Sequence, residues 1–297
     1  MHGYTKPLAI LPFDHRSFLT RTLFNKTKDL TEEEKEIIKE FKKIIYQGFL
    51  KGIEMGVPQD EAAILVDEEY GADLLADARK RGIVTILTTE KSGTELFEFQ
   101  YGDDFDEHIE TIKPTFAKVL LHYRADGDVS KNQIQLERIK LLADWCIANE
   151  YGLLMEPLIS PTEAEKNSIG QERFDNEIRP GLTVELIKQF HAAGIEVDVW
   201  KIEGFNAPEA YRAAVAEARA DGRDDVGCVV LGRSETEAHV DGWIKAGKGI
   251  DGMIGFAVGR TIFWDALDSF HKGQIDRETA IGEIAENYLH FYEVFSG

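Results

Sequence analysis

The chain has 297 residues, with 54 acidic and 34 basic side chains and a formal net charge of −20. This acidic excess argues against a surface that binds nucleic acid or an anionic membrane, because both attract cationic proteins. No stretch approaches the roughly 20 apolar residues of a membrane-spanning helix, and the N-terminus lacks a signal-peptide pattern. The only cysteines, Cys146 and Cys228, are expected to be buried free thiols of a soluble, cytoplasmic protein.

Eight short apolar runs recur along the chain, and helical patterns lie between most of them. The runs are Leu8–Phe13, Ala62–Val66, Val84–Leu87, Phe116–His122, Gly152–Glu156, Val197–Ile202, Cys228–Leu231 and Met253–Phe256. Continuous apolar runs are expected of parallel strands that are covered on both faces. Eight alternations of strand and helix predict an α/β fold, a (β/α)8 TIM barrel, which usually needs about 250 residues. An open doubly wound sheet is the alternative, but it usually has a glycine-rich turn where this chain has Asp14-His15-Arg16-Ser17.

The helical patterns begin at Thr31-Glu32-Glu33-Glu34, which resembles a capping box and opens a helix toward Met55. The others are Gly71–Arg81, Lys131–Asn149, Thr183–Ala193, Pro208–Ala220, Glu235–Ala246 and Arg277–Phe295. Nothing marks a second domain, because the 8 prolines are scattered and no glycine- or serine-rich linker appears. We therefore expect residues 1–297 to form a single domain. The acidic stretch 101–107 is expected to be a solvated loop.

A lysine stands inside the apolar run at 197–204. Side chains alternate along a strand, so Val197, Val199, Lys201 and Glu203 share one face. A buried amine is partly desolvated, which favours its neutral and nucleophilic form, and a Schiff base with a carbonyl substrate requires that form. The alternative is a lysine at a strand end that reaches water or pairs with Glu203.

Polar or glycine-rich segments follow every predicted strand, and in a barrel the chemistry gathers at these carboxyl ends. The segments contain Asp14, His15, Arg16, Asp67, Glu90, Lys118, His122, Arg124, Glu156, Lys201, Glu203, Gly232, Arg233, Gly259 and Arg260. Each one alone is also explained as a cap or a turn residue. Together they predict a pocket with two lysines, several carboxylates and an arginine-rich rim.

Two glycines in these segments, Gly232 and Gly259, are each followed by an arginine. Loops after the seventh and eighth strands of a barrel often bind phosphate through backbone N–H groups and a helix N-terminus. A short helix can open at Thr261, so the pattern fits a phosphate site. Two ordinary helix-starting turns explain it equally well.

The sequence gives weaker signals for a metal site, and for a serine or cysteine nucleophile, than for the lysine chemistry above. The 8 histidines form no H-x-H or H-E-x-x-H pair, although His15, His122, Asp67 and Glu90 leave a distributed metal site open. The chain has no G-x-S-x-G motif and no G-x-x-x-x-G-K-[ST] phosphate loop.

Long segments of the chain resemble the aldolase-like domain family of myo-inositol catabolism, which is assigned to cleavage of 2-deoxy-5-keto-gluconate 6-phosphate. These segments are Leu11–Arg16, Val66–Gly71, Glu90–Gly93, Asp198–Gly204, Val230–Arg233 and Gly255–Trp264. The resemblance covers nearly the whole chain. More distantly, the chain resembles the class I tagatose-bisphosphate and sulfofructose-phosphate aldolases, which are Schiff-base barrel enzymes without a metal.

The resemblance implies a class I aldolase that needs no cofactor and no metal. Lys201 would form the Schiff base, Glu156 would be the general acid and base, and Lys118, Asp14 and Glu90 would complete the catalytic group. The resemblance also implies that Arg260, with Gly259 and Gly232, binds the phosphate. We further expect His15 to bind the substrate, and Arg16, Arg124 or Arg233 to bind the remote carboxylate.

The products of this reaction would be dihydroxyacetone phosphate and malonate semialdehyde. The chain would bind a small sugar phosphate, and we expect it to form a homo-oligomer. Two alternatives stay open. One is a class I aldolase or transaldolase for another sugar phosphate or sulfosugar phosphate. The other is a barrel that binds sugar phosphates without catalysis.

Overall fold

A computed structural model describes residues 3–27, 29–233 and 235–297. All eight predicted strands are present and form a closed parallel barrel, in which each strand pairs with its sequence neighbours and β8 pairs with β1. The strands are β1 (Leu8–Pro12), β2 (Ala62–Val66), β3 (Val84–Thr88), β4 (Phe116–His122), β5 (Gly152–Leu158), β6 (Val199–Glu203), β7 (Gly227–Leu231) and β8 (Met253–Ala257). The predicted (β/α)8 barrel is confirmed.

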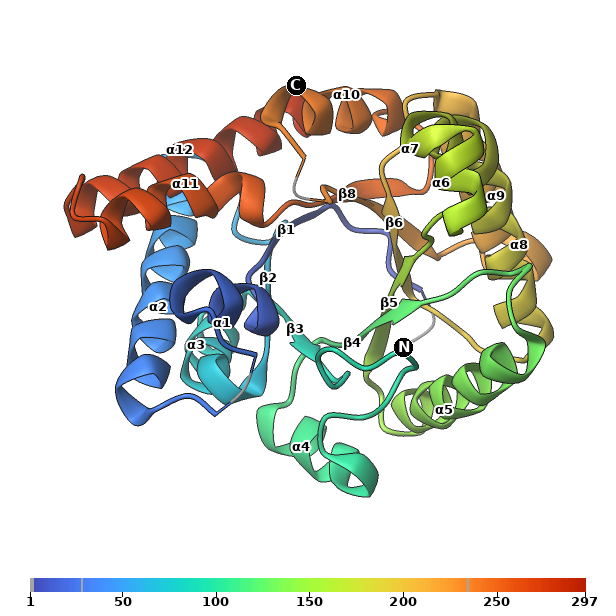
Figure 1. Ribbon diagram of the computed structural model, residues 1–297, viewed down its shortest axis with the longest axis horizontal. Helices are drawn as coiled ribbons and strands as arrows, with labels where there is room; N and C mark the ends of the chain where they lie inside the picture. Colours follow the sequence, from blue (N-terminus) through green and yellow to red (C-terminus); the bar gives the residue numbers. More distant parts are fainter. Residues whose placement is uncertain (1–2, 28, 234) are drawn as a thin grey trace.

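Helices surround the barrel, as Figure 1 shows in a view along its axis. They are α1 (Arg16–Phe24), α2 (Glu32–Met55), α3 (Glu68–Lys80), α4 (Phe105–Ile112), α5 (Val129–Ala148), α6 (Glu163–Ser168), α7 (Gly170–Arg173), α8 (Arg179–Ala192), α9 (Pro208–Ala218), α10 (Glu237–Gly247), α11 (Arg260–His271) and α12 (Arg277–Ser296). The predicted capping box is confirmed, because the Thr31 hydroxyl accepts from the Glu34 N–H and the Glu34 carboxylate accepts from the Thr31 N–H. Across the described ranges, no helix is long and apolar enough to span a membrane.

The acidic stretch 101–107 is not the solvated loop that its charge predicts. A short turn, η1 (Gly102–Asp104), leads directly into α4. Phe105 and Ile109 lie one helical turn apart and are both buried, and the Tyr101 ring stacks on His108 at 3.4 Å. The acidic side chains occupy the exposed face of the first turn, where the helix dipole favours negative charge. Their charge therefore marks a helix start.

The barrel interior changes from apolar to charged along its axis. Its apolar part comprises Leu8, Ile10, Ala63, Leu65, Ile86, Phe116, Leu154, Val199, Val229, Ile254 and Ala257. Because side chains alternate along a strand, the interior positions two residues later on β3, β4, β5 and β6 are Thr88, Lys118, Glu156 and Lys201. All four are buried. Parallel strands of a closed barrel thus place two lysines and a glutamate in one layer.

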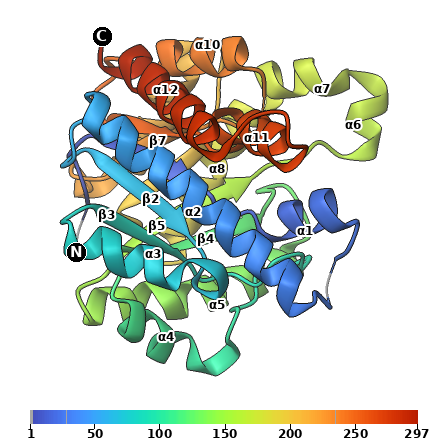
Figure 2. The same ribbon diagram turned by 90° about the vertical axis from the view of Figure 1, so that its left-hand side faces the viewer.

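Short segments gather at the carboxyl end of this barrel. In Figure 2, α1, α6 and α7 lie at one end of the molecule, and the N-terminus lies at the opposite end. The β3–α4 connection folds into a hairpin, with an antiparallel bridge between Glu90 and Phe99. The hydroxyls of Ser17 and Ser92 share a hydrogen bond, which fastens this hairpin to α1. The hairpin and α1 thereby cover part of the charged layer.

Candidate active site

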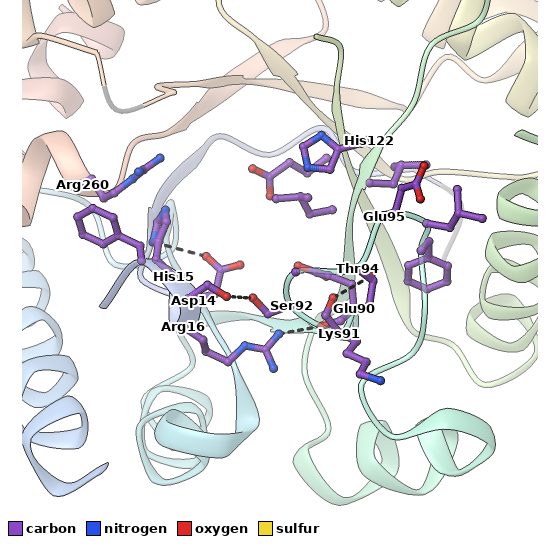
Figure 3. Close-up of a pocket in the computed structure, with 18 residues that line it drawn as sticks. Asp14, His15, Arg16, Glu90, Lys91, Ser92, Thr94, Glu95, His122 and Arg260 are labelled. Carbon is purple, nitrogen blue, oxygen red and sulfur yellow. Dashed lines mark hydrogen bonds and ion pairs between the residues drawn. The ribbon is translucent and has the colours of Figure 1, made fainter. Parts of the chain in front are cut away.

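A cavity of about 260 Å³ opens at the carboxyl end of the barrel (Figure 3). Its polar lining includes Asp14, His15, Arg16, Glu90, Lys91, Ser92, Thr94, Glu95, His122, Glu156 and Arg260. Figure 3 shows Arg260 and His15 on one side and Glu95 on the other, with Asp14, Arg16 and Glu90 between them. The amine of Lys201 lies 2.8 Å from the Glu156 carboxylate, so it belongs to the same site.

Lys118 is the point on which three carboxylates converge. Its ammonium lies 2.9 Å from Asp14 Oδ2, 2.7 Å from Glu90 Oε1 and 2.9 Å from Glu156 Oε2, and the side chain is fully buried. Burial alone lowers the pKa of Lys118, but the three carboxylates together raise that pKa well above its usual value. Lys118 is therefore a fixed positive charge.

Glu156 lies between the two lysines. Its Oε1 contacts Lys201 and its Oε2 contacts Lys118. Burial raises the pKa of Glu156, yet the charges of Lys118 and Lys201 outweigh this effect and lower the pKa overall. Glu156 is thus ionised at neutral pH and is placed to accept a proton from a group bound beside Lys201.

Lys201 lies where the strand pattern predicts it, on the interior face of β6. Only 2% of the residue is exposed, so its amine does not reach bulk water. It also does not pair with Glu203, because Glu203 contacts Arg179 and Arg233 instead. Both alternatives considered from the sequence are therefore excluded by the position of this side chain.

The pKa values of the remaining two carboxyl groups are shifted in opposite directions. Burial raises the pKa of Asp14, but the combined effect of Lys118, His15 and Lys201 lowers it overall, and Thr88 Oγ1 donates a hydrogen bond of 3.0 Å to Asp14 Oδ2. Burial raises the pKa of Glu90, and its Oε2 accepts no hydrogen bond from the residues that the structure describes. Neighbouring carboxyl groups with opposite pKa shifts are suited to different roles, one anionic and one able to carry a proton.

The central ammonium leads to a first prediction, on stability. Replacing Lys118 by methionine leaves three carboxyl groups facing one another in a buried layer, so we expect about 3–5 kcal/mol of destabilisation near pH 7. The pKa values of these carboxyl groups would rise above their unfolded values, so folding would bind protons and the deficit would shrink as the pH falls. Urea unfolding of both proteins at about pH 7 and about pH 5 measures this. A deficit that is equal at both pH values contradicts the charge argument.

The N-terminus of α11 lies at the edge of the cavity. Gly259 precedes this helix, and a Cβ there would lie 2.4 Å from the Pro12 carbonyl oxygen and 2.9 Å from His15 Cε1, so only glycine fits. Among the described residues, the N–H groups of Arg260 and Thr261 donate to no acceptor. Free N–H groups at a helix N-terminus favour a bound anion.

Arg260 and His15 complete this edge. The Arg260 guanidinium lies 4.9 Å from the Phe18 ring centre, and it makes no ion pair with any carboxylate in the described ranges. Burial lowers the pKa of Arg260, although Asp14 and Glu156 oppose the change. Burial also lowers the pKa of His15, to about 4, so its ring is neutral at pH 7. The positive charge at this edge therefore comes from Arg260.

The three arginines predicted for a remote anion differ in their surroundings. Arg124 pairs with Asp126 and Glu165, and Arg233 pairs with Glu203 and Asp175. Neither arginine lines the cavity.

Arg16 does line the cavity. It donates to the Gln100 side-chain oxygen at 2.9 Å and to the Glu90 carbonyl at 2.8 Å, and its buried Nε lacks a partner in the part of the chain described. Both acceptors are neutral, so Arg16 forms no ion pair within the described ranges.

Some functional positions had no clear signal in the sequence. Thr88 follows the alternation of β3 and was open to prediction from it, because it lies two residues after the interior Ile86. Phe18 and Gln100 contact the two arginines only through the fold, and no local pattern indicates them. Gly232 lies outside the cavity lining, and its N–H donates to the Ala257 carbonyl at 3.2 Å.

Comparison with known proteins places the chain in a family. A family model described as "uncharacterized protein conserved in bacteria (DUF2090)" matches residues 2–296. The chain belongs to the DUF2090 family. No curated protein matches this DUF2090 chain.

Solved structures are similar to this DUF2090 protein in fold. Cgl0159 from Corynebacterium glutamicum has a TM-score of 0.58 and 13% identity, covering 95% of this chain and 85% of that one. A fructose-bisphosphate aldolase from Slackia heliotrinireducens has a TM-score of 0.58 and 14% identity, covering 95% of this chain and 86% of that one. At these identities the likeness shows a shared TIM barrel fold.

Proposed function

We propose that this protein is a Schiff-base (class I) aldolase that cleaves 2-deoxy-5-keto-gluconate 6-phosphate to dihydroxyacetone phosphate and malonate semialdehyde. The observation that carries the proposal is the buried amine of Lys201, 2.8 Å from the ionised Glu156 at the edge of a cavity. An amine beside a general base is the pair that imine chemistry requires. The resemblance of the sequence motifs supplies the substrate class.

In the proposed reaction, Lys201 attacks the C5 ketone, and loss of water gives an iminium ion. The Glu156 carboxylate removes the proton of the C3 hydroxyl, and the C3–C4 bond breaks as its electron pair moves into the iminium. Malonate semialdehyde leaves, and an enamine remains on Lys201. Glu156 returns its proton to C4, and water hydrolyses the imine to release dihydroxyacetone phosphate and the free amine.

The other charged groups of the layer would hold the substrate hydroxyls. Lys118 fixes Asp14 and Glu90 through contacts of 2.9 and 2.7 Å, so neither carboxyl group has to reorganise during the reaction. Asp14 is an anionic acceptor for a hydroxyl hydrogen. Glu90, whose pKa is raised by burial, is suited to donate a hydrogen bond to a hydroxyl oxygen.

The two arginines without carboxylate partners support a substrate with two anionic groups. The phosphate is next to the ketone in the substrate, so we assign it to Arg260 and the N-terminus of α11, which lie beside Asp14 and His15. We assign the remote carboxylate to Arg16. Arginines without an ion-pair partner beside a cavity are well placed to pair with an anionic ligand, and they stand out in a chain with a net charge of −20.

A second prediction tests these assignments. Arg260→Met should weaken capture of dihydroxyacetone phosphate by about 10- to 100-fold, the effect of losing a charge-assisted hydrogen bond. Arg16→Met should leave that capture unchanged but raise the KM for the carboxylate-bearing substrate by a similar factor. Arg124→Met is the matched control, because its guanidinium is already paired with Asp126 and Glu165. Equal losses in the Arg16 and Arg124 variants would argue against the assignment.

The reaction class is tested by reduction with borohydride in the presence of dihydroxyacetone phosphate. We expect one stable adduct, on the peptide that contains Lys201. Cleavage assays with 2-deoxy-5-keto-gluconate 6-phosphate, tagatose bisphosphate and sulfofructose phosphate then identify the substrate. Tight binding without an adduct or turnover would favour a non-catalytic barrel, and loss of activity in EDTA would favour a metal-dependent mechanism.

A further inference from the structure

Four charged side chains form a closed ring of ion pairs outside the cavity lining. Arg179 Nη1 lies 3.2 Å from Asp175 and 3.3 Å from Glu203. Arg233 completes the ring, with its Nη1 3.3 Å from Asp175 and its Nε 3.0 Å from Glu203. Each cation therefore contacts both anions, and the ring as a whole is neutral.

The ring joins segments that are far apart in the sequence. Asp175 belongs to a π-helical turn, η2 (Phe174–Ile178), and Arg179 begins α8. Glu203 ends β6, and Arg233 lies in the loop after β7. A charge-assisted network of this kind fixes the relative positions of its members, because separating any pair removes one of the two partners of each charge.

Two members of the ring, Glu203 and Arg179, are held by further hydrogen bonds, and Arg233 is more exposed than either. Glu203 Oε2 accepts a hydrogen bond of 2.8 Å from the Ile159 N–H, and Arg179 Nη2 donates one of 3.1 Å to the Gly204 carbonyl. Only 1% of the Arg179 side chain and 4% of Glu203 are exposed, against 24% of Arg233. The buried members thus form an anchor to which the Arg233 loop is tied.

The backbone of Arg233 also indicates a constrained loop. Its φ angle is +49°, in the left-handed region, which is unfavourable for a residue other than glycine. Such a conformation persists only where surrounding contacts hold it, and here Glu203 and Asp175 supply them.

This loop packs against the turn that starts α11. The Gly232 N–H donates to the Ala257 carbonyl at 3.2 Å, and Thr261 Oγ1 donates to the Glu235 carbonyl at 3.0 Å. A Cβ on Gly232 would lie 3.2 Å from the Val258 side chain, so the two segments are close there. The position of the Arg233 loop therefore affects the free N–H groups at the α11 N-terminus.

We infer that Arg233 is a positioning residue, which Glu203 and Asp175 hold so that the loop after β7 fixes the anion site at the N-terminus of α11. Glu203 lies two residues after Lys201 on β6, so the same strand carries the proposed nucleophile and the anchor of the phosphate site. The inference rests on the proposed function, in that the anion is taken to be the substrate phosphate.

The test compares two ketones that differ only in the phosphate. Borohydride traps the imine over a range of dihydroxyacetone or dihydroxyacetone phosphate concentrations, in wild type, Arg233→Gln, Arg233→Lys and Arg223→Gln. Arg223→Gln is the matched control, because it removes an equivalent ion pair, which Arg223 forms with Glu196 at 2.8 Å.

We expect Arg233→Gln to raise the half-saturating concentration of dihydroxyacetone phosphate about tenfold, the effect of one charge-assisted interaction. The half-saturating concentration of dihydroxyacetone should stay unchanged. Arg233→Lys should restore part of the loss, and the control should match wild type. Equal losses for both ketones, or no loss for either, would overturn the inference.

A separate measurement distinguishes failure of the inference from failure of the proposed function. If wild type traps neither ketone on Lys201, the aldolase proposal is wrong, and the anion site is then tested with inorganic phosphate alone. Phosphate should raise the thermal unfolding midpoint of wild type and of Arg223→Gln, and should raise that of Arg233→Gln less. An equal shift in all three proteins, or no shift in wild type, would overturn the role of Arg233.

Discussion

Lys201→Met is expected to abolish both cleavage and borohydride trapping, with a fall in kcat of about 10⁵-fold or more, as for removal of other covalent nucleophiles. Methionine has a similar length, fits a buried strand position and has no amine. The variant should stay folded, because Glu156 still pairs with Lys118 at 2.9 Å after the Lys201 amine is removed. Turnover and the mass of the Lys201 peptide after reduction are the two measurements.

Lys201→Arg is the companion variant, because it keeps a positive charge beside Glu156 but cannot form an imine. We expect it to be as inactive as the methionine variant, which separates nucleophilic catalysis from electrostatic stabilisation. Full activity in either variant would refute the mechanism. So would an adduct on Lys118, whose ammonium is held by three carboxylates.

Glu156→Gln is expected to lower kcat by about 10²- to 10⁴-fold, the usual contribution of a general acid and base. The amide cannot accept the hydroxyl proton, whereas Lys201 is still present to form the imine. Reduction with dihydroxyacetone phosphate should therefore still label Lys201 after long incubation, although cleavage is slow. Stopped assays of turnover and of adduct mass on the same preparations measure the two effects.

Glu90→Gln is the control for this substitution. Burial raises the pKa of Glu90, and the proposed mechanism assigns it no proton transfer, so we expect a much smaller loss of kcat than for Glu156→Gln. Both residues contact the same Lys118 ammonium, so a general loss of packing would affect them alike. If the Glu90 variant is the more damaged of the two, the general base has been misassigned.

The order of elements and the interior layer were open to prediction from local patterns. Strand and helix periods are properties of a few neighbouring residues, so eight alternations indicate the barrel. The two-residue period then places Lys201 and Glu203 on one face of their strand, and closure of the barrel brings Glu156 and Lys118 into the same layer. The helix α4 escaped prediction, because its charge run hides the spacing of Phe105 and Ile109.

The pairing of the charges was decided only by the tertiary structure. Arg16, Arg124 and Arg233 all follow predicted strands, yet Arg16 alone lines the cavity without a carboxylate partner in the described ranges. Arg233 instead meets Asp175, which is 58 residues away in the sequence. A long, flexible arginine side chain can reach several partners, and the arrangement of lowest free energy depends on which carboxylates are buried beside it. That choice is made by contacts between distant segments, which no local period contains.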